Sequence, residues 1–154
     1  MYEKKLLAGW GDMDFNAHMR NTAYLDKSGD VRMIFFSEHG FPMTEFSRLR
    51  LGPVIQKDEI EYFREVNLLD ELKVTLSIAG LAEDGSRWII RNEFFRPDGK
   101  LAARVTSAGG WLDLSVRKLV TAPAGLLAAM KELSRSSDFQ ELPSNIRQQP
   151  QALR

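Results

Sequence analysis

Apolar side chains recur at helical spacing between Thr22 and Glu38, which predicts the longest helix of the chain. Gly40 follows, at a position where a glycine commonly ends a helix. Before the helix, the short apolar run KKLLAGWG at residues 4–11 is typical of a first strand. Residues 9–21 would then form the loop from strand to helix. The apolar positions that set the helical spacing are Tyr24, Leu25, Val31, Ile34 and Phe35.

Beyond the Gly-Pro pair at residues 52–53, the spacing changes to alternation of apolar and polar residues. The alternation is clearest in LKVTLSI at residues 72–78, and it is the pattern of a strand with one buried face. The segments EDGS at 83–86 and PDGK at 97–100 are Asp-Gly turns between apolar runs. Such turns are a specific hairpin signal, so this half of the chain is predicted to be an antiparallel sheet.

The predicted order is a strand, a long helix, four strands and a short helix that begins at Pro123. The pair Gly109-Gly110 in the last strand indicates a bulge or a close backbone approach. A sheet of this kind can bury itself and the long helix by curving around it, which gives an α+β fold. We expect one domain over residues 1–133, and a flexible tail over the polar residues 134–154.

Composition excludes several classes of function. Lys plus Arg and Asp plus Glu both number 21, so no basic field favours nucleic acid or an anionic membrane. The chain has no cysteine, which excludes thiolate metal ligands and a cysteine nucleophile and agrees with a reducing compartment. The sequence contains no apolar run long enough to predict a signal peptide or a membrane span. We therefore expect a cytoplasmic protein.

The loop at residues 9–21, GWGDMDFNAHMRN, gathers most of the candidate chemistry. It holds two aspartates, two asparagines and His18, one of only two histidines in the chain. The simplest interpretation is that the aspartates stabilise turns. His39 lies far from His18 in the sequence, beside the end of the long helix, where a cation interacts favourably with the helix dipole. The histidines lack the spacing of a helical zinc site, so we expect no metal.

The same loop resembles a motif of hotdog-fold acyl-CoA thioesterases of the 4-hydroxybenzoyl-CoA thioesterase type. That motif is close to D-x-D-x-x-G-H-x-N-N-x-x-Y, and residues 12–24 of this chain are DMDFNAHMRNTAY. The order of elements extends the resemblance to residues 3–133. The chain departs from the motif at Ala17, where glycine is usual, and at Arg20, where the first asparagine is usual.

The resemblance implies a hotdog fold, with a curved antiparallel sheet wrapped around one long central helix. It implies that Asp14 is the nucleophile or general base in thioester hydrolysis, while the backbone N–H of Asn21 polarises the thioester carbonyl. A helix N-terminus suits that second role, because its N–H groups lack intrahelical partners. His18 could orient Asp14 or a water molecule, and Asp12 is expected to be structural.

Partners also follow from the resemblance. The substrate would be an acyl-CoA, with coenzyme A as part of the substrate and no separate cofactor. Subunits would pair edge to edge into a homodimer, or further into a tetramer, with the active site at the interface. Arg117 and Lys118 follow the last predicted strand and are candidates for contacts with the phosphates of coenzyme A.

Three alternatives remain open. Asp26 and Asp30 on the long helix are competing catalytic carboxylates, although the interleaved Lys27 and Arg32 indicate a solvated face. A hotdog enoyl-CoA hydratase is a second hypothesis, because DFNAHM is similar to the motif D-x-N-P-x-H. Here, however, Asp14 and the histidine are four positions apart instead of five, and alanine stands in place of proline. A non-catalytic acyl-CoA-binding protein is the third.

Overall fold

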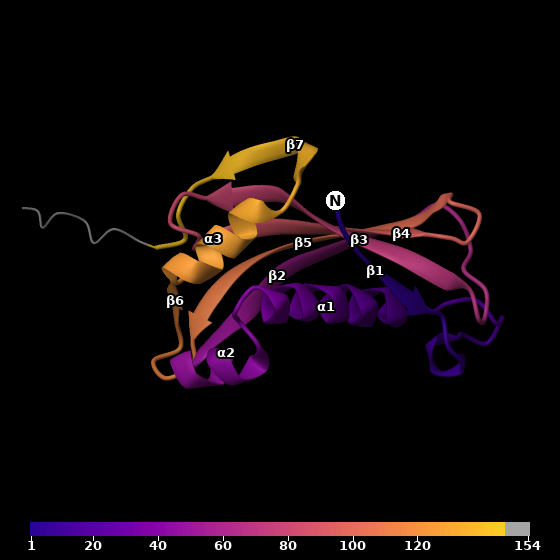
Figure 1. Cartoon of the computed structure of the whole chain (residues 1–154), viewed down its shortest axis with the longest axis horizontal. Coiled ribbons are helices and arrows are strands. Elements are labelled where there is room, and N and C mark those ends of the chain that lie inside the picture. Colours follow the sequence, from indigo (N-terminus) through magenta and orange to yellow (C-terminus); the bar gives the residue numbers. More distant parts are fainter. Residues whose placement is uncertain (147–154) are drawn as a thin grey trace, which may run out of the picture.

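The computed structural model describes residues 1–146, and a curved antiparallel sheet around a long helix dominates it (Figure 1). The helices are α1 (Asn21–Glu38), α2 (Met43–Leu49) and α3 (Ala124–Glu132), with a short 3₁₀ turn, η1, at Trp10–Asp12. The strands are β1 (Tyr2–Leu7), β2 (Leu51–Tyr62), β3 (Glu71–Ala82), β4 (Arg87–Phe95), β5 (Leu101–Asp113), β6 (Lys118–Val120) and β7 (Arg135–Leu142).

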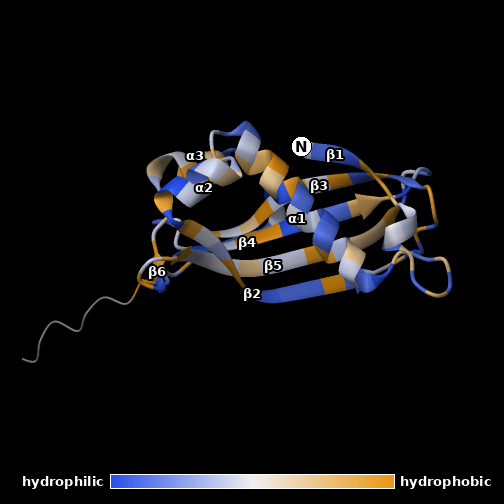
Figure 2. Cartoon of the chain, turned by 90° about the horizontal axis from the view of Figure 1, so that it is seen from below, coloured by the Kyte–Doolittle hydropathy of each residue, from blue (hydrophilic) through white to orange (hydrophobic). Residues whose placement is uncertain are grey.

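The main strands follow the order β1-β3-β4-β5-β2, with every neighbouring pair antiparallel. β6 adds to β5, and β7 pairs in parallel with the second half of β3. Figure 2 shows α1 crossing the sheet on the face seen from below. The predicted α+β class, with one long helix against a curved antiparallel sheet, is confirmed.

The core lies between α1 and the face of the sheet that the helix covers. α1 contributes Val31, Phe35 and Phe36, and the alternating positions of the strands supply the opposite wall. Strand residues that are fully buried there include Leu72, Leu76, Ile78, Trp88, Ile90, Phe94 and Trp111. Because α1 is held along its length by this core, its N-terminal end has a fixed position against the sheet.

The periodicity predicted these elements closely. α1 begins at Asn21, one residue before the predicted start, and ends at Glu38 as expected. The Asp-Gly segments are the turns between β3, β4 and β5. Gly109 is a site of close backbone approach, because a Cβ at this position would collide with the carbonyl oxygen of Val54.

Three short elements were not predicted, and one of them corrects the predicted tail. α2 and β6 contain too few residues to show a period, and β7 is mostly polar. Residues 135–142 are nevertheless part of the sheet, since β7 pairs with β3 and Phe139 packs against the core. The prediction of a flexible tail is therefore wrong for these residues, while residues 147–154 of that tail lie outside the described part.

Candidate functional site

The loop between β1 and α1 folds back on itself, so its two ends meet. Met13 and Met19 form an isolated β-bridge across its base. Beyond that bridge, the N–H of Asp14 donates to the carbonyl of His18 over 2.7 Å, and the N–H of Ala17 donates to the carbonyl of Asp14 over 3.1 Å. Asp14 therefore lies at the neck of a closed turn.

Backbone donors hold the Asp14 carboxylate in place. Its Oδ1 accepts hydrogen bonds from the N–H of Asn16 at 2.8 Å and from the N–H of His18 at 3.1 Å. The side chain is exposed to solvent. Both of these bonds use Oδ1, which leaves Oδ2 free of them.

Asp12 has a different environment, one that fits a structural role. Its Oδ2 accepts from the N–H of Gly9 at 2.8 Å and pairs with Lys27 Nζ at 2.9 Å. Partial burial opposes ionisation of this carboxyl, but the bonds from Lys27 and Gly9 outweigh burial, so the pKa of Asp12 is lowered. Lys27 also donates to the carbonyl of Leu7 at 2.9 Å. Asp12 thus ties the loop to both β1 and α1.

The start of α1 lies directly beside this loop. The N–H of Arg20, the residue before the helix, donates to the carbonyl of Asp12 over 2.8 Å. The Asn21 side chain accepts the N–H of Thr22 at 3.0 Å, which satisfies one of the helix's first donors. Other N–H groups of a first turn, that of Asn21 among them, have no acceptor within the helix itself. The loop therefore brings a carboxylate and a helix N-terminus to one end of the molecule.

Tyr24, on the first turn of α1, is a candidate residue to which the sequence assigned no role. Its ring is buried and packs edge-on against Tyr62, at 5.5 Å between centroids, and against Phe94, at 5.2 Å. Burial, then Tyr62 and then the charge of Asp14 raise the pKa of Tyr24 to about 12. The phenol is therefore protonated at neutral pH, so Tyr24 supplies a neutral hydroxyl group to this end of the molecule.

A groove of about 280 Å³ opens beside these residues. His18, Met19 and Tyr24 line one side of it, and the segment 62–66 lines the other. His18 Nε2 lies 3.1 Å from Glu65 Oε2, so the ring contact that the structure shows is with Glu65. The link between His18 and Asp14 is made by the His18 backbone N–H instead.

The remaining sequence candidates lie elsewhere. Arg117 ends the turn before β6 and Lys118 is the first residue of β6, at the opposite end of the sheet from the Asp14 loop (Figure 1). Asp26 and Asp30 are exposed on α1, as predicted for a solvated face. Lys27 and Arg32 do not share that face, which corrects the prediction, because each side chain bonds to groups inside the fold.

His39 ends α1, and its Nδ1 lies 2.8 Å from the carbonyl oxygen of Phe35, near the negative end of the helix dipole. Its Nε2 lies 3.2 Å from Glu132 Oε2 on α3. The structure therefore keeps His39 a full helix length away from His18.

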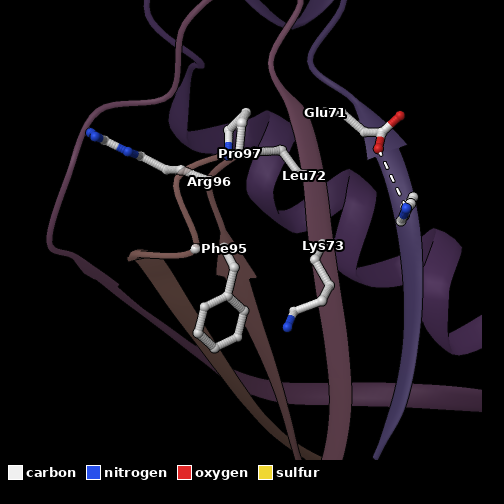
Figure 3. A pocket seen from close by; sticks show the side chains of 8 residues that line it. Glu71, Leu72, Lys73, Phe95, Arg96 and Pro97 are labelled. Carbon is white, nitrogen blue, oxygen red and sulfur yellow. Dashed lines mark ion pairs between the residues drawn. The ribbon is translucent and has the colours of Figure 1, made fainter.

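Another hollow, of about 260 Å³, lies between Lys5 of β1, the start of β3 and the β4–β5 turn (Figure 3). It contains three cations, but each has a carboxylate partner. Lys5 lies 3.7 Å from Glu71, Lys73 lies 3.8 Å from Glu3, and Arg96 lies 2.6 Å from Asp98. This pairing makes the hollow a weaker candidate for an anionic ligand than its basic residues suggest.

Within residues 1–146, no three His, Cys, Asp or Glu side chains are grouped closely enough to hold a metal ion. No helix in that range combines the length and the apolar character needed to cross a bilayer.

Comparison with known families agrees with the geometry. A family model described as the thioesterase-like superfamily matches residues 8–130, which is most of the chain. No curated protein sequence matches the chain significantly.

Solved structures with the same fold include a protein in complex with CoA and two proteins described as thioesterases. A Staphylococcus aureus protein in complex with CoA has a TM-score of 0.78 and 19% identity, over 97% of this chain and 89% of that protein. A 1,4-dihydroxy-2-naphthoyl-CoA thioesterase from Synechocystis has a TM-score of 0.76 and 17% identity, over 86% and 96%. A probable thioesterase from Escherichia coli has a TM-score of 0.69 and 18% identity, over 86% and 98%. The hotdog fold is confirmed.

The loop also contains a strained position that can be tested. Ala17 has a φ of 62°, in the left-handed region that glycine adopts without penalty, and it is exposed. We expect Ala17→Gly to raise the free energy of unfolding by about 1 kcal/mol, measured by chemical denaturation. Ala128→Gly, at an exposed position inside α3, is the control and should lower it by about 1 kcal/mol. A loss of stability at both positions would contradict the strain at Ala17.

Proposed function

Because the chain belongs to the thioesterase-like superfamily, we propose that it hydrolyses an acyl-CoA thioester to a free acid and CoA. The observation that carries the proposal is the Asp14 carboxylate, held by two backbone N–H groups in a loop whose base is bonded to the start of α1. Thioester hydrolysis needs a base or nucleophile on one side of the carbonyl and hydrogen-bond donors on the other. This end of the molecule offers both.

In the general-base form of the reaction, Asp14 Oδ2 removes a proton from water and the resulting hydroxide adds to the thioester carbon. The carbonyl oxygen then carries the negative charge, which the N–H of Asn21 and the positive end of the α1 dipole stabilise. When the carbonyl re-forms, the C–S bond breaks and CoA leaves as the thiolate. The thiolate takes up the proton that Asp14 removed from water, which regenerates the carboxylate, and the free acid remains.

In the nucleophilic form, Asp14 itself adds to the carbonyl and expels the CoA thiolate, which leaves an acyl-aspartyl anhydride. Water then hydrolyses this anhydride and regenerates the carboxylate. Both forms use the same two groups, Asp14 and the Asn21 N–H. CoA enters only as part of the substrate, and no further cofactor takes part.

Tyr24 and His18 would act around these groups. Tyr24 lines the groove beside Asp14, and its protonated phenol would donate a hydrogen bond to the substrate or to the attacking water. His18 lines the same groove, and Glu65 holds its ring by a 3.1 Å contact. We assign His18 a positioning role and Tyr24 the role of a hydrogen-bond donor to the reacting groups.

The replacement Asp14→Asn tests the proposal. It keeps the size of the side chain and the acceptor for the loop's backbone N–H groups, and it removes the carboxylate. We expect kcat and kcat/KM for acyl-CoA hydrolysis to fall together by at least about 100-fold, because the lost interaction belongs to the transition state. The measurement is steady-state hydrolysis over a panel of aromatic and short, medium and long aliphatic acyl-CoAs.

Asp12→Asn is the matched control in the same loop. It breaks the ion pair with Lys27, so its main effect should be on thermal stability rather than on kcat. Asp26→Asn, on the exposed face of α1, should change neither. A folded Asp14→Asn protein with normal turnover would overturn the assignment. A wild-type protein that binds one acyl-CoA tightly and hydrolyses none would instead be an acyl-CoA-binding protein.

We further propose that the chain forms a homodimer or homotetramer. β2 ends the sheet order, and among residues 1–146 only β5 pairs with this 12-residue strand. An outer edge of this length that also exposes Ile55 and Tyr62 favours pairing with another copy. Light scattering at micromolar concentration should give a molecular mass of two or four times 17.5 kDa. A stable monomer would exclude a shared sheet and an interfacial site.

A further inference from the structure

A further cavity, distinct from the hollow in Figure 3, lies between α1 and the sheet and has a volume of about 280 Å³. It shares no lining residue with the groove beside Asp14. Its walls are largely apolar and aromatic. They include Leu25, Met33, Phe36, Ile90, Trp88 and Trp111. A cavity of this kind normally receives an apolar group, and a few polar groups in its wall then decide which one.

Arg32 is the cation in this wall. Its Nε donates to Asn92 Oδ1 at 3.0 Å, and its Nη2 donates to Ser107 Oγ at 2.7 Å. Both partners are uncharged and fully buried, and they use only some of the N–H donors of a guanidinium. Ser107 in turn donates to Oδ1 of Asp58, a carboxylate that lines the same cavity. The remaining N–H groups of Arg32 are suited to an acceptor from outside the protein.

Burial also makes the positive charge of Arg32 energetically unfavourable. Burial lowers the pKa of Arg32 to about 10, and the charge of Asp58 only partly opposes this effect. The guanidinium still remains protonated at neutral pH. A charged group in such a position is stabilised by any ligand that supplies further acceptors.

Trp88 and Trp111 line the cavity with their rings, while their indole N–H groups are buried in the protein and not exposed in the cavity. The indole Nε1 atoms of Trp88 and Trp111 are buried and have no hydrogen-bond partner in the described part of the chain, and the two side chains are only 2% and 0% exposed. A buried donor without a partner costs about 1–3 kcal/mol. The charged groups of the cavity wall are Arg32 and Asp58, and the donors available to a ligand are therefore the Arg32 N–H groups that Asn92 and Ser107 do not use.

We propose that this cavity receives the acyl group of the substrate and selects acyl groups that carry a hydrogen-bond-accepting oxygen at the end remote from the thioester. The inference rests on the proposed function and adds the substrate class. The positions of the cavity residues along α1 agree with this proposal. Leu25 is one turn beyond Asn21, and Arg32 is about 16 Å beyond Asn21 along the helix axis. The Arg32 side chain leans back toward the N-terminus, so a medium-length acyl chain can reach it.

Thioether analogues of acyl-CoA, which cannot be hydrolysed, test this selectivity without requiring turnover. The probes are octyl-CoA, ω-hydroxyoctyl-CoA and ω-carboxyheptyl-CoA, and the measurement is the dissociation constant by titration calorimetry. We expect at least one ω-oxygenated analogue to bind about tenfold or more tightly than octyl-CoA, as a hydrogen bond to a charged donor should provide. The analogue that binds more tightly distinguishes a hydroxyl from a carboxylate as the preferred group.

Arg32→Met removes the donors and keeps an apolar side chain of similar length. It should reduce the preference to within about twofold while leaving the affinity for octyl-CoA nearly unchanged. Arg32→Lys keeps the charge, should retain preference for a carboxylate, and serves if the methionine variant does not fold. Asp30→Asn, exposed on the same helix, is the control and should keep the wild-type preference.

The outcomes separate the two proposals. Equal binding of all three analogues by the wild-type protein would overturn the selectivity and leave thioester hydrolysis intact. An unchanged preference in a folded Arg32→Met variant would also overturn it. Binding of none of the analogues would refute the acyl-CoA function and, with it, the selectivity.

Discussion

The buried ammonium group of Lys27 is the interaction on which the candidate site depends. Lys27 is only 9% exposed, and its Nζ contacts both the carbonyl of Leu7 and the carboxylate of Asp12 at 2.9 Å. One side chain of α1 thereby fixes the end of β1 and the beginning of the loop. A buried lysine without such partners would cost several kcal/mol, so the three groups specify one another's positions. Because Asp14 follows Asp12 by two residues in the same loop, this arrangement also determines the position of Asp14.

The fold divides the proposed chemistry along α1. The N-terminal end of the helix lies beside Asp14 and the groove lined by His18 and Tyr24. About three turns further on, Arg32 points into the cavity under the helix. A substrate that used both regions would place its thioester at the helix N-terminus and its acyl group along the helix. The division explains how one scaffold could keep the reacting groups constant while the acyl pocket varies.

Local patterns in the sequence predicted most of the fold. The spacing over α1 and the Asp-Gly turns need only neighbouring residues, and the same is true of the Asp14 loop, whose motif is contiguous. The inward position of Arg32 could not be predicted in this way, because its partners Asn92 and Ser107 lie 60 and 75 positions away. β7 was missed for a related reason: its pairing with β3 depends on backbone groups, which composition does not reveal.

The most direct test of the account is a crystal structure with a ketone analogue of an acyl-CoA, in which a methylene group replaces the thioester sulfur. The account predicts that the ketone oxygen accepts a hydrogen bond from the N–H of Asn21, and that Asp14 Oδ2 faces the carbonyl carbon within about 3.5 Å or through one water molecule. A ketone bound against the outer face of α1, next to Asp26 or Asp30, would contradict it.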